Sequence, residues 1–467
     1  MTRAGLDSDR DTIAAIATAP GAGAVGIVRL SGPAAQNIAS ALFRSPHPGF
    51  AGLRPHRLHH GRLVDRQGRT LDEVLAASMP GPASFTGEDV VELHCHGGVA
   101  VLRAVLEECQ AHGARLARAG EFSLRAFLNG KLDLTQAEAI AESIAAPTRA
   151  ALHLAQMKLS GALGGRINTL RESLEALRAQ LCLAVDFPEE DVECLPRSVL
   201  AGEARRVAGE AGALLAAARR ARAWREGALA VLAGPVNAGK SSLMNALVGR
   251  MRAIVSEAPG TTRDYLEEAL DLDGLVVRLV DTAGLREDEG VGSVEAQGQE
   301  LSRDFMARAE AVLYLLDGSR PLPNSERSVL QTLDTARTLV VLNKGDLPAA
   351  EPDVPEFLAA LGLAQVRISA RTGLGVEELA ARLRERLLAG HAEPDPDEVA
   401  PNARQAATLE RAQAELLALA EDSDAELPYD ILGVRLESAC RLLAEITGDI
   451  APQEVLDSIF SRFCIGK

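Results

Sequence analysis

The sequence lacks the cysteine spacing of a disulfide-stapled or zinc-bound fold. Its 467 residues contain six cysteines, and no two of them stand in CxxC spacing. Small disulfide scaffolds and structural zinc sites both need such clusters. We therefore expect reduced cysteines and a cytoplasmic protein.

Long hydrophobic runs are also absent. The longest candidates, such as residues 228–233, have the length of a strand, whereas a membrane helix needs about 18 apolar residues. The N-terminus carries Asp7, Asp9 and Asp11 and does not resemble a signal peptide. We expect neither a membrane span nor a secretory leader.

An excess of positive charge is missing as well. Lys and Arg number 49 against 65 Asp and Glu, a formal net charge of −16. A protein that coats nucleic acid with its whole surface is basic, so any nucleic-acid partner must be held locally. Residues 1–131 carry 14 basic and 12 acidic side chains, which places the acidity in the later part of the chain.

The first half of the chain divides into two segments. Residues 1–130 mix short apolar runs with Gly/Pro turns, which indicates an α+β domain. Residues 131–226 have a helical pattern, with a possible capping box at residues 135–138 (TQAE). A stripe at spacings of three and four predicts a buried helix face: Ile167, Leu170, Leu174, Leu177 and Leu181.

The second half contains an α/β pattern followed by helices. Within residues 227–390, strand-like runs alternate with helix-length stretches, which predicts βα units around a mostly parallel sheet. The runs are 228–233, 275–280, 311–316, 338–342 and 365–368. Residues 391–402 resemble a linker, and residues 391–467 continue into helices. We therefore expect a multidomain α+β and α/β protein, with the α/β domain inserted into a helical domain.

A phosphate-binding loop follows the first of these strands. Residues 234–241 (GPVNAGKS) fit GxxxxGK[ST] between a predicted strand and a predicted helix. Backbone N–H groups of such a loop surround phosphate oxygens, Lys240 adds charge at the β- and γ-phosphates, and the Ser241 hydroxyl is placed for Mg²⁺. The motif alone does not distinguish ATP from GTP. The predicted contacts are Asn237, Ala238, Gly239, Lys240, Ser241 and Ser242.

Three further motifs predict a GTP site: one serves Mg²⁺ and the γ-phosphate, and two contact guanine. Residues 281–284 fit DxxG, and residues 343–346 (NKGD) fit NKxD. The Asp346 carboxylate can accept from guanine N1–H and the 2-amino group, which adenine lacks, and such a site can reject the analogue about 10⁴-fold. These motifs contribute the contacts Asp281, Thr282, Ala283, Gly284, Asn343, Lys344 and Asp346, with Ser369, Ala370 and Arg371 in a last base-contacting loop.

A switch segment completes the predicted GTP site. It comprises Ser256, Glu257, Ala258, Pro259, Gly260, Thr261 and Thr262, and Thr262 is expected to close on Mg²⁺ and the γ-phosphate. Ras-like enzymes place a glutamine directly after DxxG to orient water. Leu285 stands there and cannot hydrogen-bond, so another group must orient the water and a cation must stabilise the transition state.

Motifs along nearly the whole chain resemble the MnmE (TrmE) family of tRNA-modifying GTPases. They include residues 26–32 (GIVRLSG), 84–89 (SFTGED), 120–123 (GEFS) and 129–134 (NGKLDL), besides the GTPase motifs and the ending 463–467 (FCIGK). The resemblance implies a homodimer whose first domain dimerises and binds a tetrahydrofolate, as a 5-formyl or 5,10-methylene derivative. The folate contacts it implies are Arg29, Glu92, Lys131 and Lys467, with Cys464 close by and linked to the modification chemistry.

The resemblance also implies potassium-activated GTP hydrolysis. Asn237 and oxygens of Ser256, Ala258 and Thr261 would hold K⁺, while Ser241 and Thr262 would hold Mg²⁺. Glu295, in residues 294–298 (VEAQG), would orient the water. The expected catalytic residues are Glu295, Lys240 and Cys464.

The function implied is tRNA modification. With the flavoprotein MnmG, in a heterotetramer, the enzyme would add a carboxymethylaminomethyl or aminomethyl group at C5 of the wobble uridine of certain tRNAs. A regulatory or ribosome-assembly GTPase of the Era-like class is the alternative. Arg219, Arg220, Arg222 and Arg225 form either a solvated helix face or a local tRNA contact.

Overall fold

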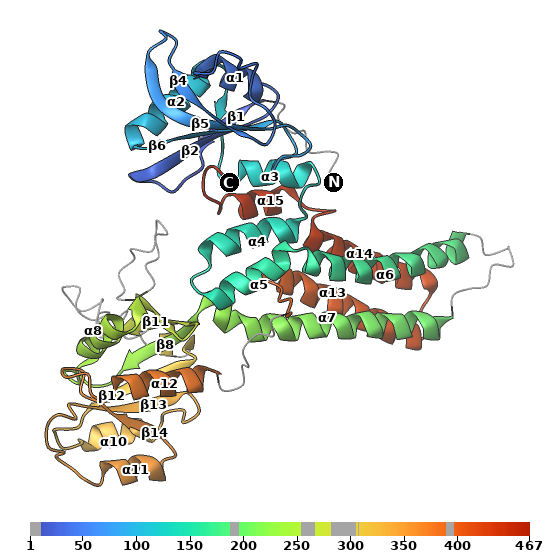
Figure 1. The fold of residues 1–467 in the computed structure, drawn as a ribbon. Coiled ribbons are helices and arrows are strands. Elements are labelled where there is room, and N and C mark those ends of the chain that lie inside the picture. The colour runs from blue at the N-terminus through green and yellow to red at the C-terminus, as the bar shows by residue number, and fades with distance from the viewer. Residues whose placement is uncertain (1–10, 187–195, 254–266, 282–304, 307, 389–396) are drawn as a thin grey trace, which may run out of the picture. The chain divides into compact units, whose positions relative to one another are not determined.

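The computed structural model describes residues 11–186, 196–253, 267–281, 305–306, 308–388 and 397–467. The chain divides into two compact units (Figure 1). The first comprises Met1–Ile144, Ala155–Leu215 and Ala403–Lys467, and the second comprises Ala145–Leu154 and Ala216–Asn402. Among the described residues, no helix is long and apolar enough to cross a membrane.

The first unit begins with a seven-stranded sheet in the order β3-β4-β5-β6-β2-β1-β7. Neighbouring strands are antiparallel except for the parallel pair β1–β7. The strands are β1 Ile13–Ile16, β2 Gly23–Ser31, β3 Phe43–Arg44, β4 Leu58–Val64, β5 Thr70–Met79, β6 Val90–Gly97 and β7 Arg115–Leu116.

Two helices, α1 (Ala35–Leu42) and α2 (Val99–Ala111), pack on one face of this sheet. On β6, Val91, Leu93 and Cys95 point into the core beneath these helices. Because side chains alternate along a strand, Glu92 and His94 share the other face. The sheet thus has one apolar face and one face that carries polar groups.

Helices make up the rest of the first unit. They are α3 Glu121–Leu128, α4 Leu134–Ala145, α5 Arg149–Leu159, α6 Ala162–Asp186, α7 Arg197–Glu226, α13 Ala403–Asp424, α14 Tyr429–Thr447 and α15 Gln453–Phe460, of which α5 and α7 extend into the second unit. The predicted stripe lies on α6 and all five of its residues are buried. Helix α14 packs against both α6 and α13.

The capping box predicted at residues 135–138 is wrong. Helix α4 is capped by Asp133, whose carboxylate accepts from Gln136 N at 2.8 Å, while Gln136 Oε1 accepts from Asp133 N at 3.0 Å. This is the reciprocal pattern of a capping box displaced by two residues. Glu138 accepts instead from Arg404 and Gln405, because the first turn of α13 lies beside it.

The second unit contains a seven-stranded sheet in the order β14-β13-β12-β8-β11-β10-β9. The first five strands in this order are parallel, and β10 and β9 are antiparallel additions. The elements are β8 Ala228–Ala233, α8 Lys240–Arg250, β9 Arg252–Ala253, β10 Glu267–Leu272, β11 Leu275–Asp281, β12 Ala311–Asp317, α10 Asn324–Leu330, β13 Thr338–Asn343, α11 Val354–Ala360, β14 Ala364–Arg367 and α12 Val376–Leu388.

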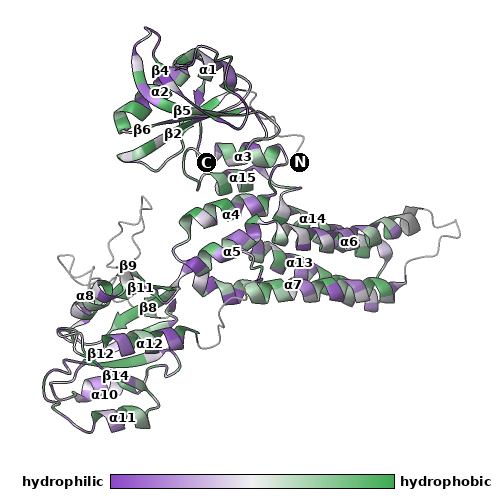
Figure 2. Cartoon of the chain, in the orientation of Figure 1, coloured by the Kyte–Doolittle hydropathy of each residue, from purple (hydrophilic) through white to green (hydrophobic). Residues whose placement is uncertain are grey.

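Apolar side chains cover both faces of this sheet, and its strands are hydrophobic in Figure 2. One core contains side chains of α8 and α12 together with Trp224. The other contains side chains of α11 and Leu330 of α10. Burial on both faces explains the near-continuous apolar strands that predicted a parallel sheet.

Candidate functional site

The phosphate-binding loop joins β8 to α8 at the carboxyl end of the parallel strands. Gly239 precedes the helix with φ +99°, and a Cβ there would collide with the Asn343 side chain. Only glycine avoids both the strain of a left-handed backbone and this steric collision. Asn237 also has a positive φ, +65°, and its side chain is exposed. The loop thus has the strained backbone that turns N–H groups toward an anion at a helix N-terminus.

Lys240 and Ser241 occupy the first turn of α8. Lys240 Nζ donates to the carbonyls of Gly234 and Pro235, both at 2.9 Å, and so lies folded over the loop. Ser241 Oγ donates to Asp281 Oδ2 at 3.0 Å, and Asp281 is 1% exposed. A hydroxyl beside a buried carboxylate is a donor set that suits Mg²⁺, so these two residues fit the predicted metal site.

The base-reading loops meet at Asp346. Its carboxylate accepts from Ser369 Oγ at 2.7 Å and from Arg371 Nη2 at 2.7 Å. These bonds, that of Ser369 first, lower the pKa of Asp346 below its usual value. The carboxylate is therefore kept ionised, which the acceptor role predicted for it in NKxD requires.

Asn343 ties the two loops together. Its side chain donates to Ala238 O at 2.8 Å, and its Oδ1 accepts from Ala370 N at 3.0 Å. Asn343 is 3% exposed, so both bonds are sheltered from water. It acts as a brace between the phosphate loop and the base loops.

Asp317, at the end of β12, belongs to the site although the sequence motifs do not include it. Its carboxylate accepts from Lys344 Nζ at 2.6 Å. Burial raises the pKa of Asp317, but the hydrogen bonds from Lys344 and Ser319 outweigh burial and hold that pKa below its ordinary value. The aspartate fixes the lysine of NKxD, and its position at a parallel strand's carboxyl end was the only available signal.

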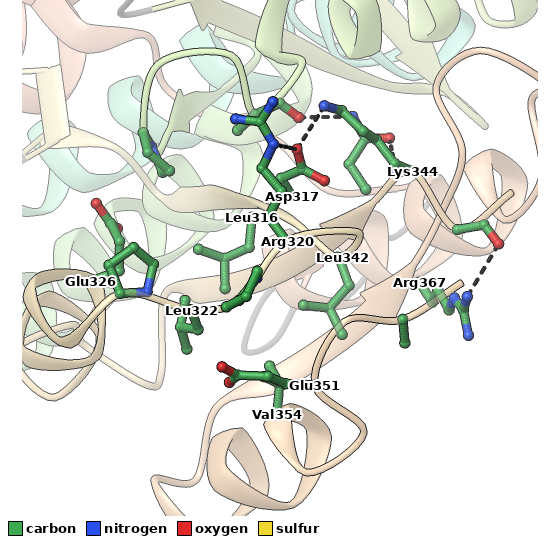
Figure 3. A pocket seen from close by; sticks show the side chains of 18 of the residues that line it. Leu316, Asp317, Arg320, Leu322, Glu326, Leu342, Lys344, Glu351, Val354 and Arg367 are labelled. Carbon is green, nitrogen blue, oxygen red and sulfur yellow. Dashed lines mark hydrogen bonds and ion pairs between the residues drawn. The ribbon is translucent and has the colours of Figure 1, made fainter. Parts of the chain in front are cut away.

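A cavity of about 440 Å³ opens beside the Asp317–Lys344 pair (Figure 3). Its wall includes Val236 and Asn237 of the phosphate loop, and apolar side chains such as Leu316, Leu322 and Val354. Lys240, Ser241 and Asp346 are not part of the lining. The cavity therefore shares Asn237, Ala238, Asn343 and Lys344 with the predicted nucleotide site, but not the remaining contacts just named.

Several predicted residues lie outside the described residues. They are Ser256, Glu257, Ala258, Pro259, Gly260, Thr261, Thr262, Thr282, Ala283, Gly284 and Glu295. Their roles at the γ-phosphate, at K⁺ and at the attacking water stay predictions.

A second polar site lies on the first unit's sheet. Arg29 of β2 and Glu92 of β6 face each other in register, and Arg29 Nη2 lies 2.8 Å from Glu92 Oε1. Arg29 Nη1 also donates to Gly466 O at 3.1 Å, across 437 residues of chain. The pair is thus joined to the predicted C-terminal motif.

The segment 464–467 packs against this sheet. Gly466 has φ +95°, and a Cβ there would collide with the carbonyl of Ile16 on β1. Phe122 N donates to Lys467 O at 3.2 Å, and Cys464 is exposed. The glycine is required for this close approach, which holds Cys464 and Lys467 near the Arg29–Glu92 pair.

Lys131 does not contact that pair. Its Nζ donates to Pro82 O at 3.0 Å, and the lysine side chain lies against Gly87. The loop that holds Pro82 and Gly87 also reaches the Arg29–Glu92 pair. Its residue Phe85 lies under Arg29, with 6.0 Å between the guanidinium carbon and the ring centre. Lys131 therefore contacts the loop that borders the Arg29–Glu92 pair, but it is not part of that ion pair.

Two neighbours of the Arg29–Glu92 pair were missed by sequence reasoning. Phe122 is fully buried with its ring centre 5.7 Å from the Arg29 guanidinium carbon. His94 Nε2 lies 3.3 Å from Glu92 Oε2. The alternation along β6 already placed His94 on the face of Glu92, whereas Phe122 lies in the motif at residues 120–123 (GEFS) without a role assigned to it.

Family comparisons decide between the possible classes of GTPase. Residues 12–131 match the family model described as the GTP-binding protein TrmE N-terminus, and residues 134–464 match the MnmE helical domain. The chain belongs to the MnmE family. Its relatives are named tRNA modification GTPase MnmE, so it is a GTP-hydrolysing enzyme of tRNA modification.

MnmE relatives match over nearly their full length. The protein of Nitratidesulfovibrio vulgaris (strain DP4) is 53% identical over 461 residues, which cover 98% of this chain and 99% of the relative. The protein of Lawsonia intracellularis is 44% identical, covering 98% and 100%, and that of Geobacter sulfurreducens is 42% identical, covering 98% and 99%. Among solved structures, the G domain of the T. maritima FeoB iron transporter is 26% identical, with a TM-score of 0.26 and coverage of 34% of this chain and 98% of that one.

Proposed function

We propose that this MnmE enzyme couples GTP hydrolysis to one-carbon chemistry on tRNA. Together with the flavoprotein MnmG, it would add a carboxymethylaminomethyl or aminomethyl group at C5 of the wobble uridine, and a bound tetrahydrofolate would supply the one-carbon unit. The observation that carries this proposal is the Arg29–Glu92 pair, whose arginine also donates a hydrogen bond to the Gly466 carbonyl. A ribosome-assembly GTPase of the Era-like class has no use for such a site.

The polar groups of this site fit a folate. The Glu92 carboxylate can accept from the amide and amino edge of a pterin, and the anionic glutamate tail of the cofactor needs cations, which Lys131 and Lys467 supply. Phe85 and Phe122 add aromatic surface beside Arg29. Cys464, exposed on the adjoining segment, would take part in the modification.

Arg29→Ala tests the folate site. We expect binding of 5-formyltetrahydrofolate, measured by calorimetry, to weaken at least tenfold, about 1.4 kcal/mol, because Glu92 and the Gly466 carbonyl both lose their cation. Arg103→Ala, an exposed arginine on α2, is the matched control. GTP hydrolysis should be unchanged in both variants; wild-type folate affinity in Arg29→Ala would refute the assignment.

We also propose that K⁺ completes the GTP site. Asn237, exposed on the phosphate loop at positive φ, would hold the ion with Ser256, Ala258 and Thr261. Ser241 and Thr262 would hold Mg²⁺, with Asp281 bound through water. Fixed positive charge at the β/γ bridge stabilises the charge that develops there, and Glu295 would orient the water that Leu285 cannot.

Hydrolysis rates in KCl and NaCl at equal ionic strength test this mechanism. We expect strong stimulation by K⁺ alone, and Asn237→Ala should abolish the difference because the ion loses a side-chain ligand. Val236→Ala, the exposed neighbour in the same loop, should keep it. Equal rates of the wild type in both salts would remove the potassium mechanism and leave the GTP site standing.

The same proposal extends to the assembly of the protein and to its domain boundaries. We infer a cytoplasmic homodimer that joins MnmG in a heterotetramer, with a folate-binding domain at residues 1–130, helical segments at 131–226 and 391–467, and an inserted G domain at 227–390. The division of the chain supports the insertion, since segments of the first unit precede and follow the second. The change between family models near residue 132 supports the first boundary.

A further inference from the structure

Positive charge is concentrated in one stretch of this acidic chain. Residues 44–69 contain six arginines against one aspartate, a formal charge of +5 in a chain of −16. They run from β3 through a loop and β4 into the next turn, at the end of the sheet formed by β3 and β4. Figure 2 shows that turn as strongly hydrophilic.

Three of these arginines are exposed and uncompensated. In the part of the chain that the structure describes, no carboxylate lies within ion-pair distance of Arg54, Arg57 or Arg62. Glu73 stands opposite Arg62 in the β4–β5 register, but its carboxylate bonds His60 Nε2 at 2.7 Å instead. The charge of Arg62 therefore remains available to an external anion.

Arg62 also faces a second arginine. Arg44 of β3 is its direct partner across the β3–β4 pair, and like charges in this position destabilise a sheet. Arg44 Nη1 donates to the carbonyls of Ser40 and Phe43 and finds no carboxylate among the described residues. A bound anion would remove the repulsion between the two guanidinium groups.

The loop that carries Arg54 and Arg57 is ordered by its own contacts. His59 Nε2 accepts from Arg54 N at 3.3 Å, while His59 Nδ1 lies 3.0 Å from Arg57 O. His56 N donates to Ser78 O of β5 at 2.8 Å. The backbone is thus fixed before any ligand binds, which lowers the entropy lost on binding.

Strand register connects this stretch to the folate site. His60 pairs with Leu75, Leu75 with His94, and His94 lies two residues from Glu92 on β6. Because directly paired residues share a sheet face and side chains alternate, Arg62 lies on the same face as Glu92. A long ligand on the arginines would therefore extend toward that pair.

Three of the four arginines on α7 that sequence analysis left open as a tRNA contact are engaged within their own unit. Arg220 pairs with Glu398, Arg222 lies 3.6 Å from Glu310, and Arg225 donates to Pro401 O at 2.8 Å. The structure therefore favours residues 44–62 over α7 for this role.

We propose that Arg44, Arg54, Arg57 and Arg62, here called the arginine surface, bind the phosphate backbone of the tRNA substrate. A guanidinium matches a phosphate with paired hydrogen bonds, and local cationic charge is what an acidic protein needs to hold RNA. This assignment rests on tRNA being the substrate. It orients the tRNA on the sheet face of the proposed folate site, and phosphate contacts carry no sequence preference.

The triple variant Arg54→Ala/Arg57→Ala/Arg62→Ala tests the arginine surface by filter binding of tRNA over a range of KCl. We expect affinity to fall at least tenfold at low salt. The slope of log K against log salt should become shallower by about two to three, since each of the three lost phosphate contacts removes about 0.7–0.9. The affinities for substrate and non-substrate tRNAs should fall by the same factor, while GTP hydrolysis and folate binding stay at wild-type values.

The control removes the same charge elsewhere, from the exposed Arg382, Arg411 and Arg441 on α12, α13 and α14. An equal loss in this control would show a general charge effect and overturn the assignment, as would unchanged affinity and slope in the triple variant. Conversion of the triple variant to a monomer in gel filtration would overturn it too, because the surface would then bind a second copy. Loss of folate binding in Arg29→Ala tests the folate site separately.

Discussion

At the scale of single residues, Asp346 shows how the base site is prepared. Ser369 and Arg371 hold its carboxylate in place, and the Asp346 side chain is only 15% exposed. Their hydrogen bonds also lower the pKa of Asp346. A group with a lowered pKa stays ionised until the pH falls below the ordinary aspartate range, so guanine recognition should persist under mildly acidic conditions.

Asp346→Asn should exchange the preferred nucleotide. The amide donates where the carboxylate accepted, so it fits the 2-oxo group of xanthine and opposes the 2-amino group of guanine. We expect GTP affinity to fall at least a hundredfold and xanthosine triphosphate to become the better ligand in competition binding. Asp353→Asn, an exposed aspartate of the same unit, should bind GTP normally; unaltered preference in Asp346→Asn would argue against the guanine site.

At the scale of elements, the start of α13 is fixed to α4 through Glu138. Its carboxylate accepts from Arg404 Nε at 2.7 Å, Arg404 Nη2 at 2.8 Å and Gln405 Nε2 at 2.6 Å. Glu138 is 7% exposed and Gln405 is fully buried. Charged hydrogen bonds sheltered in this way are strong, so they define where the chain re-enters the helices after the G domain.

Glu138→Ala should loosen that junction. Arg404 would keep its charge without the carboxylate, and a half-buried charge that loses its partner costs about 2 kcal/mol or more. Hydrogen exchange should therefore quicken in the first turns of α13, measured by mass spectrometry. Glu410→Ala, an exposed glutamate on the same helix, is the control, and equal protection in both variants would contradict a role for Glu138.

Sequence patterns predicted the apolar strands well and missed the polar ones. The buried parallel strands β8, β11, β12 and β13 were predicted to within one residue, because strands buried on both faces are continuous apolar runs. The polar strands β4 (LHHGRLV) and β10 (EEALDL) were missed, since a strand with one exposed face gives a weaker signal. The cap of α4 was misplaced because Glu138 serves a distant helix, which local spacing cannot reveal.

At the scale of the whole molecule, the two candidate sites differ in how far apart their parts lie in sequence. The described residues of the predicted GTP site sit in short motifs at strand ends, so spacing alone suffices to propose them. The Arg29–Glu92 site joins residues 63 and 437 positions apart, and neither composition nor periodicity encodes such pairing. Resemblance to the MnmE family indicated Arg29 and Glu92, and the fold adds the aromatic neighbours and the arginine surface.

The single tryptophan offers a spectroscopic consequence. Trp224 is the only tryptophan among 467 residues, and it is 2% exposed in the core of the second unit. Its fluorescence is therefore an intrinsic reporter of that unit, with emission at the short wavelengths of a dry environment, while circular dichroism records the helices of both units. Unfolding followed by the two signals would separate the stability of the GTPase part from that of the part that carries the proposed folate site, without any added label.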